Sequence, residues 1–245
     1  MIDFGLTRHF VRRLARAKRF LGLTALASSA GWITWLSSMG ESPDTVAERF
    51  HITTATVAAV ATSIAFLMTG TATLRDERDG GTLPYLYMKP IPRWRWAISA
   101  WSAAALVCLG VGIAAWSIGW LATGINSGSW TLAVPALSLY AGAAVGYTAV
   151  FVPIGYLFSR ATLVGLAYVF VWEGIVTQFV SGLAASSVWR TAMSIYADLT
   201  VLPREALDAL GPVLPGAGGG VLKLAGTVIV GTGILSWALR QRDAL

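Results

Sequence analysis

Cysteine, histidine and charged residues are all scarce in this chain of 245 residues. Its one cysteine, Cys108, excludes an internal disulfide and a metal site built from several cysteines. Charged residues make up 12% of the chain, whereas a typical soluble domain has roughly 25%. Hydrophobic residues make up 56%, and the mean hydropathy is +0.65. This composition indicates a membrane protein.

Motifs for nucleotide binding and for catalysis inside a membrane are also missing. The sequence has no G-x-x-x-x-G-K-[ST], because the glycines near position 218 lead to Lys223 and then Leu224 instead of a hydroxyl residue. It has no H-E-x-x-H, and His9 and His51 lie at or outside the boundaries of the apolar runs. Neither histidine is placed to activate a serine within the membrane. We therefore do not expect this chain to be an enzyme.

The net charge of +6 does not indicate a nucleic-acid partner. A nucleic-acid binder gathers its lysines and arginines on a solvated face, whereas here they lie between apolar runs. The chain begins with a basic segment and lacks a short apolar stretch followed by a small-residue cleavage site, so we expect no removable signal peptide.

Six apolar segments are long enough to cross about 30 Å of hydrocarbon as helices. Membrane-spanning strands would alternate in polarity over about ten residues, whereas these runs are continuously apolar, so a barrel is excluded. We therefore predict an all-α membrane protein. The predicted spans are residues 20–39, 53–74, 96–122, 132–158, 161–182 and 220–239.

Basic residues are distributed unequally between the two sides of these spans. If both chain ends lie on one side, that side holds fourteen of the 18 lysines and arginines. The other side holds Arg49, Arg190, Arg204 and Lys223. Because short cytoplasmic segments are rich in Lys and Arg, we expect a multi-pass protein of the cell membrane with both termini in the cytoplasm.

Residues 1–19 have the periodicity of an amphipathic helix, at about 100° per residue. Such a helix would place its apolar arc in the acyl boundary and turn its basic arc toward lipid headgroups or a cytoplasmic protein. A basic flank that only sets the topology is the alternative. The apolar arc contains Leu6, Phe10, Leu14, Ala17 and Leu21, and the basic arc contains Arg8, His9, Arg12, Arg13, Arg16 and Arg19.

Residues 75–95 form the one long cytoplasmic loop of this topology, between the second and third spans. Their first five residues alternate in charge, Gly80 and Gly81 permit a turn, and Pro90 and Pro92 would end any helix. A solvated loop and a compact docked element both fit this composition. The loop also has the spacing E-x-x-x-G-T-L-x-x-L-x-x-x-P-x-x-R, formed by Glu77, Gly81, Thr82, Leu83, Leu86, Pro90 and Arg93.

This spacing, its place after the second span and the number of spans resemble the ABC-2 type (type V exporter-like) transporter permeases. The similarity in sequence is concentrated in residues 75–96 and around the VWEGIV stretch of the fifth span. The resemblance implies a basic interface helix at residues 1–19 and a transmembrane domain at residues 20–245. Within that domain it implies a coupling helix in the loop and re-entrant helices at residues 183–219. Many relatives carry a lysine where this chain has Trp101.

The resemblance also implies partners. Two permease subunits, which we expect to be identical, would pair with two ATP-binding subunits, and ATP with Mg²⁺ would be bound by those partners and not by this chain. Glu77, Arg78 and the other motif residues would fix the docking register on the ATPase, and Pro90 and Pro92 would transmit its movement. The implied activity is export of a substrate that the sequence does not identify.

Glu173 lies near the middle of the fifth predicted span, where a charged carboxylate costs at least about 2.5–3.5 kcal/mol. It is therefore expected to face protein, water or a partner. Three roles stay open: a place on the translocation path together with Gln178, a structural role within the bundle or across a dimer interface, and proton coupling. The last would make the chain a secondary transporter, which predicts internal repeats; the sequence has none that we detect.

Residues 183–219 are too long for a simple turn and too mixed in polarity for a seventh span. Ser187 is expected to cap a short helix that ends at Ala197, and Pro203 to begin a second short helix. These helices would form an external gate in the implied architecture, and a plain extracellular loop is the alternative. In the fourth span, Gly142 and Gly146 form a G-x-x-x-G pattern that permits close helix contact.

Overall fold

The computed structural model describes residues 4–81, 91–177, 183, 186–202 and 216–241. These residues are predominantly helical, and no strand occurs among them. Four helices are long and apolar enough to cross a membrane, which agrees with a multi-pass membrane protein. They are α4 (Pro43–Asp79), α6 (Arg93–Ser127), α7 (Ala136–Leu157) and α13 (Gly216–Gln241).

Helix α4 is much longer than the predicted second span. Its 37 residues extend about 55 Å at 1.5 Å per residue, so it reaches well beyond a hydrocarbon core of about 30 Å. The side chain of Ser42 caps its first turn by accepting a hydrogen bond from the backbone N–H of Thr45, with Pro43 at the first helical position. After its end, Gly81 adopts a φ of +65°, a conformation that favours glycine and stops the helix.

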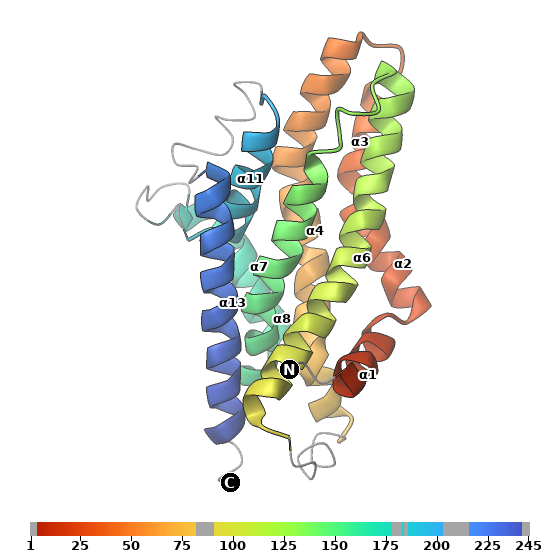
Figure 1. Ribbon diagram of the computed structural model, residues 1–245. Coiled ribbons are helices and arrows are strands. Elements are labelled where there is room, and N and C mark those ends of the chain that lie inside the picture. Colours follow the sequence, from red (N-terminus) through yellow and green to blue (C-terminus); the bar gives the residue numbers. More distant parts are fainter. Residues whose placement is uncertain (1–3, 82–90, 178–182, 184–185, 203–215, 242–245) are drawn as a thin grey trace.

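The first predicted span is divided into two short helices. Helix α2 (Ala17–Ala27) ends at Ser28, and α3 (Ser29–Ser37) follows at once. The hydroxyl of Ser28 donates to the carbonyl of Ala25, and such bonding from a serine to its own helix bends helices. Figure 1 shows α2 and α3 rising in succession beside α6. Neither helix alone is long enough to cross a membrane, so a continuous first span is not present.

The fifth predicted span also differs from a regular helix. The described part is a shorter apolar helix, Ala161–Val176. It begins as α8 (Ala161–Ala167) and continues as a π-helix, η1 (Tyr168–Val176). Residues 178–182, the end of the predicted span, lie outside the described residues. The widened π turn contains Glu173, and π-helical turns often occur at functional sites.

A separate short helix, α11 (Val188–Leu199), packs against α7 and α13. It begins as predicted at Ser187, whose side chain accepts a hydrogen bond from the backbone N–H of Arg190. The second short helix expected after Pro203 falls outside the described residues. Helix α11 lies in the upper half of the view, opposite the end occupied by α1 (Phe4–Leu14) (Figure 1).

Small residues let the long helices approach one another closely. A Cβ atom at Gly146 would lie 2.6 Å from Cγ1 of Val188 in α11, and one at Gly142 would lie 3.2 Å from Cβ of Ala192. The close contact predicted for this glycine pair is therefore confirmed, and α11 is one of the helices that uses it. Helices α7 and α13 meet in the same way at Gly231, where an added Cβ would overlap the backbone of Ala149.

The apolar face of α1 is not left to contact lipid, which corrects the prediction. Leu6, Phe10 and Leu14 are at most 4% exposed. Leu6 and Phe10 belong to a core cluster with Trp96 of α6 and Leu74 of α4. The periodicity correctly predicts an amphipathic helix, but this face packs against the helical bundle. The helix ends at Leu14, and Ala17 and Leu21, predicted on the same arc, lie exposed on α2.

Replacing Gly231 by Ala should destabilise the protein, whereas the same change at Gly233 should not. The new methyl group at Gly231 would meet the carbonyl of Ala149, and nothing lies within 4 Å of the corresponding position at Gly233. We expect Gly231→Ala to cost about 1–3 kcal/mol through overpacking. Gly233→Ala should be neutral or stabilising, because alanine favours a helix by about 0.5–1 kcal/mol over glycine. Thermal unfolding in detergent measures both, and equal melting temperatures for the two variants would contradict this packing.

Candidate functional site: a buried glutamate at the end of α4 and a polar cavity beside η1

Glu77 lies in the last turns of α4 and is 0% exposed. Its Oε1 atom is 2.7 Å from Nη1 of Arg13 and 3.0 Å from Nε2 of His9, both on α1. Arg13 also donates a 2.6 Å hydrogen bond from Nη2 to the backbone carbonyl of Asp76. A carboxylate is stable at such depth only when it is paired and hydrogen-bonded. Glu77 therefore ties α1 to the end of α4.

Other polar side chains extend this connection to three further helices. Arg19 of α2 lies 3.2 Å from the carboxylate of Asp76 and also donates to the carbonyl of Met68. Arg78 donates to the backbone carbonyl of Tyr156 at the end of α7, at 3.2 Å. Arg75 donates to the hydroxyl of Thr162 in α8, at 3.3 Å. We call Glu77, Arg13, His9 and these bonded neighbours the α4-end cluster.

The loop predicted at residues 75–95 is shorter than expected. Residues 75–79 are helical, and α6 begins at Arg93. Their alternating charges pair along the helix: Arg75 and Asp79 form an i,i+4 ion pair at 3.2 Å, which supports a helix rather than a loop. Glu77 was expected to meet a partner ATPase, but its buried carboxylate contacts α1 instead.

The remaining motif residues divide into described and undescribed positions. Gly81 is exposed and ends α4, and the guanidinium of Arg93 stacks over the ring of Trp96 at 5.9 Å. The coupling helix expected in the loop falls outside the described residues, together with Thr82, Leu83, Leu86 and Pro90.

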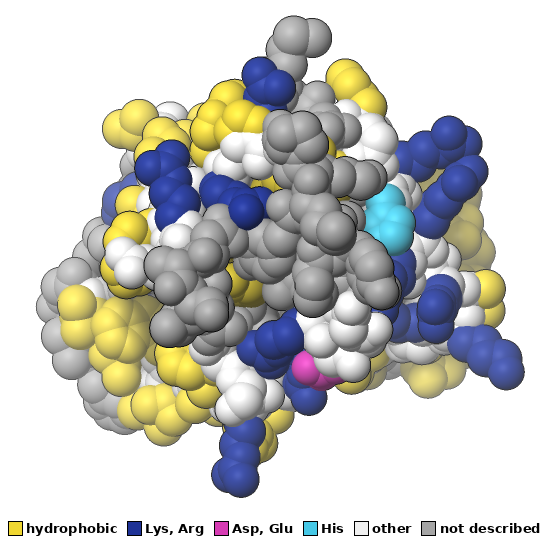
Figure 2. Space-filling view, turned by 90° about the horizontal axis from the view of Figure 1, so that it is seen from below, with side chains coloured by type: hydrophobic (Ala, Val, Ile, Leu, Met, Phe, Trp, Pro, Cys, Tyr) yellow, Lys and Arg dark blue, Asp and Glu magenta, His cyan; other side chains and the backbone are white. Residues whose placement is uncertain are grey.

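The surface next to the α4-end cluster is strongly basic. Seen from below, lysine and arginine side chains outnumber acidic ones among the described residues (Figure 2). On α1 and at its end, Arg8, Arg12 and Arg16 are exposed as predicted, whereas Arg13 is half-buried against Glu77. The basic arc therefore has two functions. Arg13 holds α1 in place, and the exposed arginines present positive charge outward.

Glu173 forms the second polar centre. Its Oε1 atom accepts hydrogen bonds from the Tyr168 hydroxyl at 3.0 Å and from the backbone N–H of Val188 at 2.9 Å. Its Oε2 atom accepts a 2.5 Å hydrogen bond from the Ser187 hydroxyl. The carboxylate thus sits at the N-terminus of α11, where a negative charge interacts favourably with the helix dipole. This arrangement gives Glu173 a structural role that joins η1 to α11.

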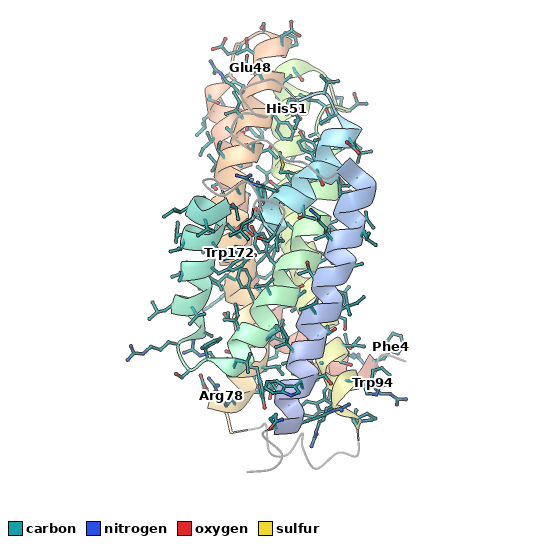
Figure 3. The ribbon with its side chains drawn as sticks, turned by 90° about the vertical axis from the view of Figure 1, so that its left-hand side faces the viewer. Phe4, Glu48, His51, Arg78, Trp94 and Trp172 are labelled. Carbon is teal, nitrogen blue, oxygen red and sulfur yellow. The ribbon has the colours of Figure 1, made fainter. Side chains whose placement is uncertain are left out.

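Glu173 also lines a cavity of about 260 Å³ between α4, α7, η1 and α11. Figure 3 shows the neighbouring Trp172 between the end that carries Phe4 and Arg78 and the end that carries Glu48 and His51. Gln178, which we predicted beside Glu173, lies outside the described residues. The polar residues around the cavity are Thr56, Ser63, Tyr147, Glu173, Ser187 and Arg190.

Two partners at these sites were not predicted as such. His9 was assigned to a basic arc without a role, although its spacing from Arg13 places both on one side of a helix. Arg190 was counted only for topology, yet it is 6% exposed and lines the cavity with Glu173. Its position could have indicated this role, because Arg190 follows the capping Ser187 by three residues and therefore lies in the first turn of a short helix.

Comparison with known proteins adds no relative. No family model matches the chain, and no curated protein matches it. The interpretation of both sites therefore rests on the geometry of this chain and on the loop motif.

Replacing Glu77 by Gln should loosen α1 from the end of α4. The neutral amide keeps the size of the side chain but removes the charge that pairs with Arg13, and hydrogen bonds to charged groups contribute about 1.5–3 kcal/mol. Limited trypsin digestion should cleave the arginine-rich α1 of this variant several times faster than that of the unchanged protein. Asp79→Asn is the matched control, because the ion pairs of Asp79 among the described residues are at least partly exposed, and surface pairs contribute about 0–1 kcal/mol. Equal cleavage of both variants would contradict the assigned role.

Replacing Glu173 by Gln should destabilise the start of α11. The amide group would place a donor where Ser187 or Val188 now donates, at a cost of about 1–3 kcal/mol for the unsatisfied group. Hydrogen exchange at the first amides of α11 should accelerate by tenfold or more. The exposed Glu48 supplies the control, Glu48→Gln, which should exchange like the unchanged protein. Unchanged protection in Glu173→Gln would show that the carboxylate does not hold α11.

Proposed function

We propose that this chain is the membrane subunit of an ATP-binding cassette transporter of the ABC-2 type. In this proposal it exports a substrate across the cell membrane, while two separate ATP-binding subunits bind and hydrolyse ATP with Mg²⁺. A second permease chain, identical to this one, completes the transporter. The observation that carries the proposal is the buried contact of Glu77 with Arg13 and His9, directly before the Gly81-Thr82-Leu83 motif.

That contact suits a membrane subunit on which a partner ATPase exerts force at the end of α4. Residues 75–79 are rigid helix bonded to α1, α2, α7 and α8. A partner that displaced the end of α4 would therefore move α1 together with it. This revises the role proposed for Glu77. In the revised role, Glu77 holds the end of α4 to α1 and does not itself touch the ATPase.

The proposed topology has six crossings. The four long apolar helices supply four of them. Helices α2 and α3 in succession would supply the first, and residues 161–182 the fifth. Both termini and the α4-end cluster would face the cytoplasm, where the exposed arginines of α1 meet anionic lipid headgroups or the ATPase.

An ion- or proton-coupled secondary transporter is the competing function. It requires Glu173 to exchange a proton or ion during transport. Both carboxylate oxygens of Glu173 already accept hydrogen bonds from Tyr168, Ser187 and Val188. This bonding favours a structural carboxylate, so we prefer the ATP-driven function.

Variants with one added cysteine test the topology and the partner together. The native Cys108 is 0% exposed, so a cysteine placed at exposed Asp79 can be labelled selectively, and one at exposed Asp44 marks the opposite end of α4. We expect Asp79→Cys to react with an impermeant maleimide only from the cytoplasmic side and Asp44→Cys only from the outside. With a candidate ATPase encoded beside this chain, Asp79→Cys should cross-link and Asp44→Cys should not. Labelling of Asp79→Cys from outside the cell would refute the proposal.

A further inference from the structure

The cavity beside η1 is lined by a buried guanidinium that the described residues leave only partly hydrogen-bonded. Arg190 is 6% exposed, and its Nη1 atom has no hydrogen-bond partner. No ion pair joins it to a carboxylate in the described part of the chain. A guanidinium stays protonated in proteins, so it cannot escape the cost of burial by losing its proton. The negative charge of Glu173 acts on it electrostatically, but a buried charged group also needs its hydrogen bonds satisfied, and Nη1 lacks an acceptor among the described residues.

Glu173 lines the same cavity, but both of its carboxylate oxygens already accept hydrogen bonds. Its oxygens accept hydrogen bonds from Tyr168, Ser187 and Val188, and it forms no ion pair with Arg190 among the described residues. The hydroxyl of Ser187 also accepts from the backbone N–H of Arg190 at 3.1 Å. The start of α11 is thereby fixed, and it holds the arginine against the cavity wall.

Part of the cavity lining on α4 and η1 is exposed among the described residues. Its rim includes Thr56 and Val60 of α4 and Gly174 of η1, all of which are exposed. Val169 and Trp189 give it apolar surface, and the hydroxyls of Ser63 and Tyr147 belong to its lining. A molecule that entered the cavity would contact both apolar side chains and the positive charge of Arg190. Trp172 of η1 lies between the two ends of the molecule (Figure 3), so this part of η1 lies away from both ends.

We propose that this cavity binds the anionic group, phosphate or carboxylate, of a small amphiphilic molecule, with the guanidinium of Arg190 as its counter-ion. The volume of about 260 Å³ lies just below the roughly 300–1,000 Å³ of typical small-molecule sites. It therefore suits one headgroup or a small acid rather than a whole lipid or a peptide. The proposal concerns binding by this chain alone and does not require an ATPase.

The test measures thermal stabilisation of the purified chain in detergent by three probes. These are phosphatidylglycerol, which carries a phosphate with net negative charge, phosphatidylcholine, which is zwitterionic, and inorganic phosphate. We expect phosphatidylglycerol to raise the melting temperature at concentrations at least tenfold below those needed for phosphatidylcholine. If inorganic phosphate also stabilises the protein, a free anion is a sufficient ligand. If inorganic phosphate does not stabilise it, the ligand is a lipid headgroup.

Variants assign the effect to Arg190. Arg190→Gln should lose the preference for phosphatidylglycerol, and Arg190→Lys should keep part of it. Arg49→Gln is the control, because Arg49 pairs with Glu41 at 2.9 Å on the surface, and it should behave like the unchanged protein. If Arg190→Gln does not fold, Ala59→Leu fills the cavity from α4 and should weaken binding at least tenfold. Equal responses to all three probes, or an undiminished preference in the folded variants, would overturn the proposal.

Discussion

The ion pair between Glu77 and Arg13 is the interaction on which the lower end of the molecule depends. A carboxylate that is 0% exposed requires compensation, and α1 supplies it through Arg13 and His9. The same packing buries Leu6 and Phe10 against α4 and α6. This amphipathic helix is therefore part of the bundle, while its outer arginines and Phe4 stay exposed.

Helix α4 links this cluster to the other end of the molecule. Near its start, the buried His51 forms a 2.6 Å hydrogen bond with the hydroxyl of Tyr196 in α11. The first turn of α11 is held in turn by Glu173 of η1. One continuous helix thus contacts α1 at one end and α11 at the other. The same helix also lines the cavity that it shares with α11.

The sequence predicts the elements better than their contacts. Apolar runs correctly locate α4, α6, α7 and α13, because a long uncharged segment has few alternatives to a helix. The Ser187 cap and the turn expected at Gly80 and Gly81 are correct, because each depends on local backbone chemistry. The break at Ser28 and the helical state of residues 75–79 are missed, because hydropathy does not register the Ser28 hydrogen bond to Ala25 or the Arg75–Asp79 ion pair. The pairing of Glu77 with Arg13 joins positions 64 residues apart, which periodicity alone does not reveal.

The contacts of Glu77 and Glu173 explain why so apolar a chain contains these two carboxylates. Glu77 and Glu173 each accept hydrogen bonds or ion pairs from a second helix, α1 in one case and α11 in the other. Contacts between apolar helices in lipid gain little from the hydrophobic effect, because lipid tails are equally apolar, and close packing and polar contacts must hold them. The short helices α1 and α11 also lack the length to be fixed by a hydrophobic span. A buried carboxylate supplies the direction and register that their apolar faces alone would leave undefined.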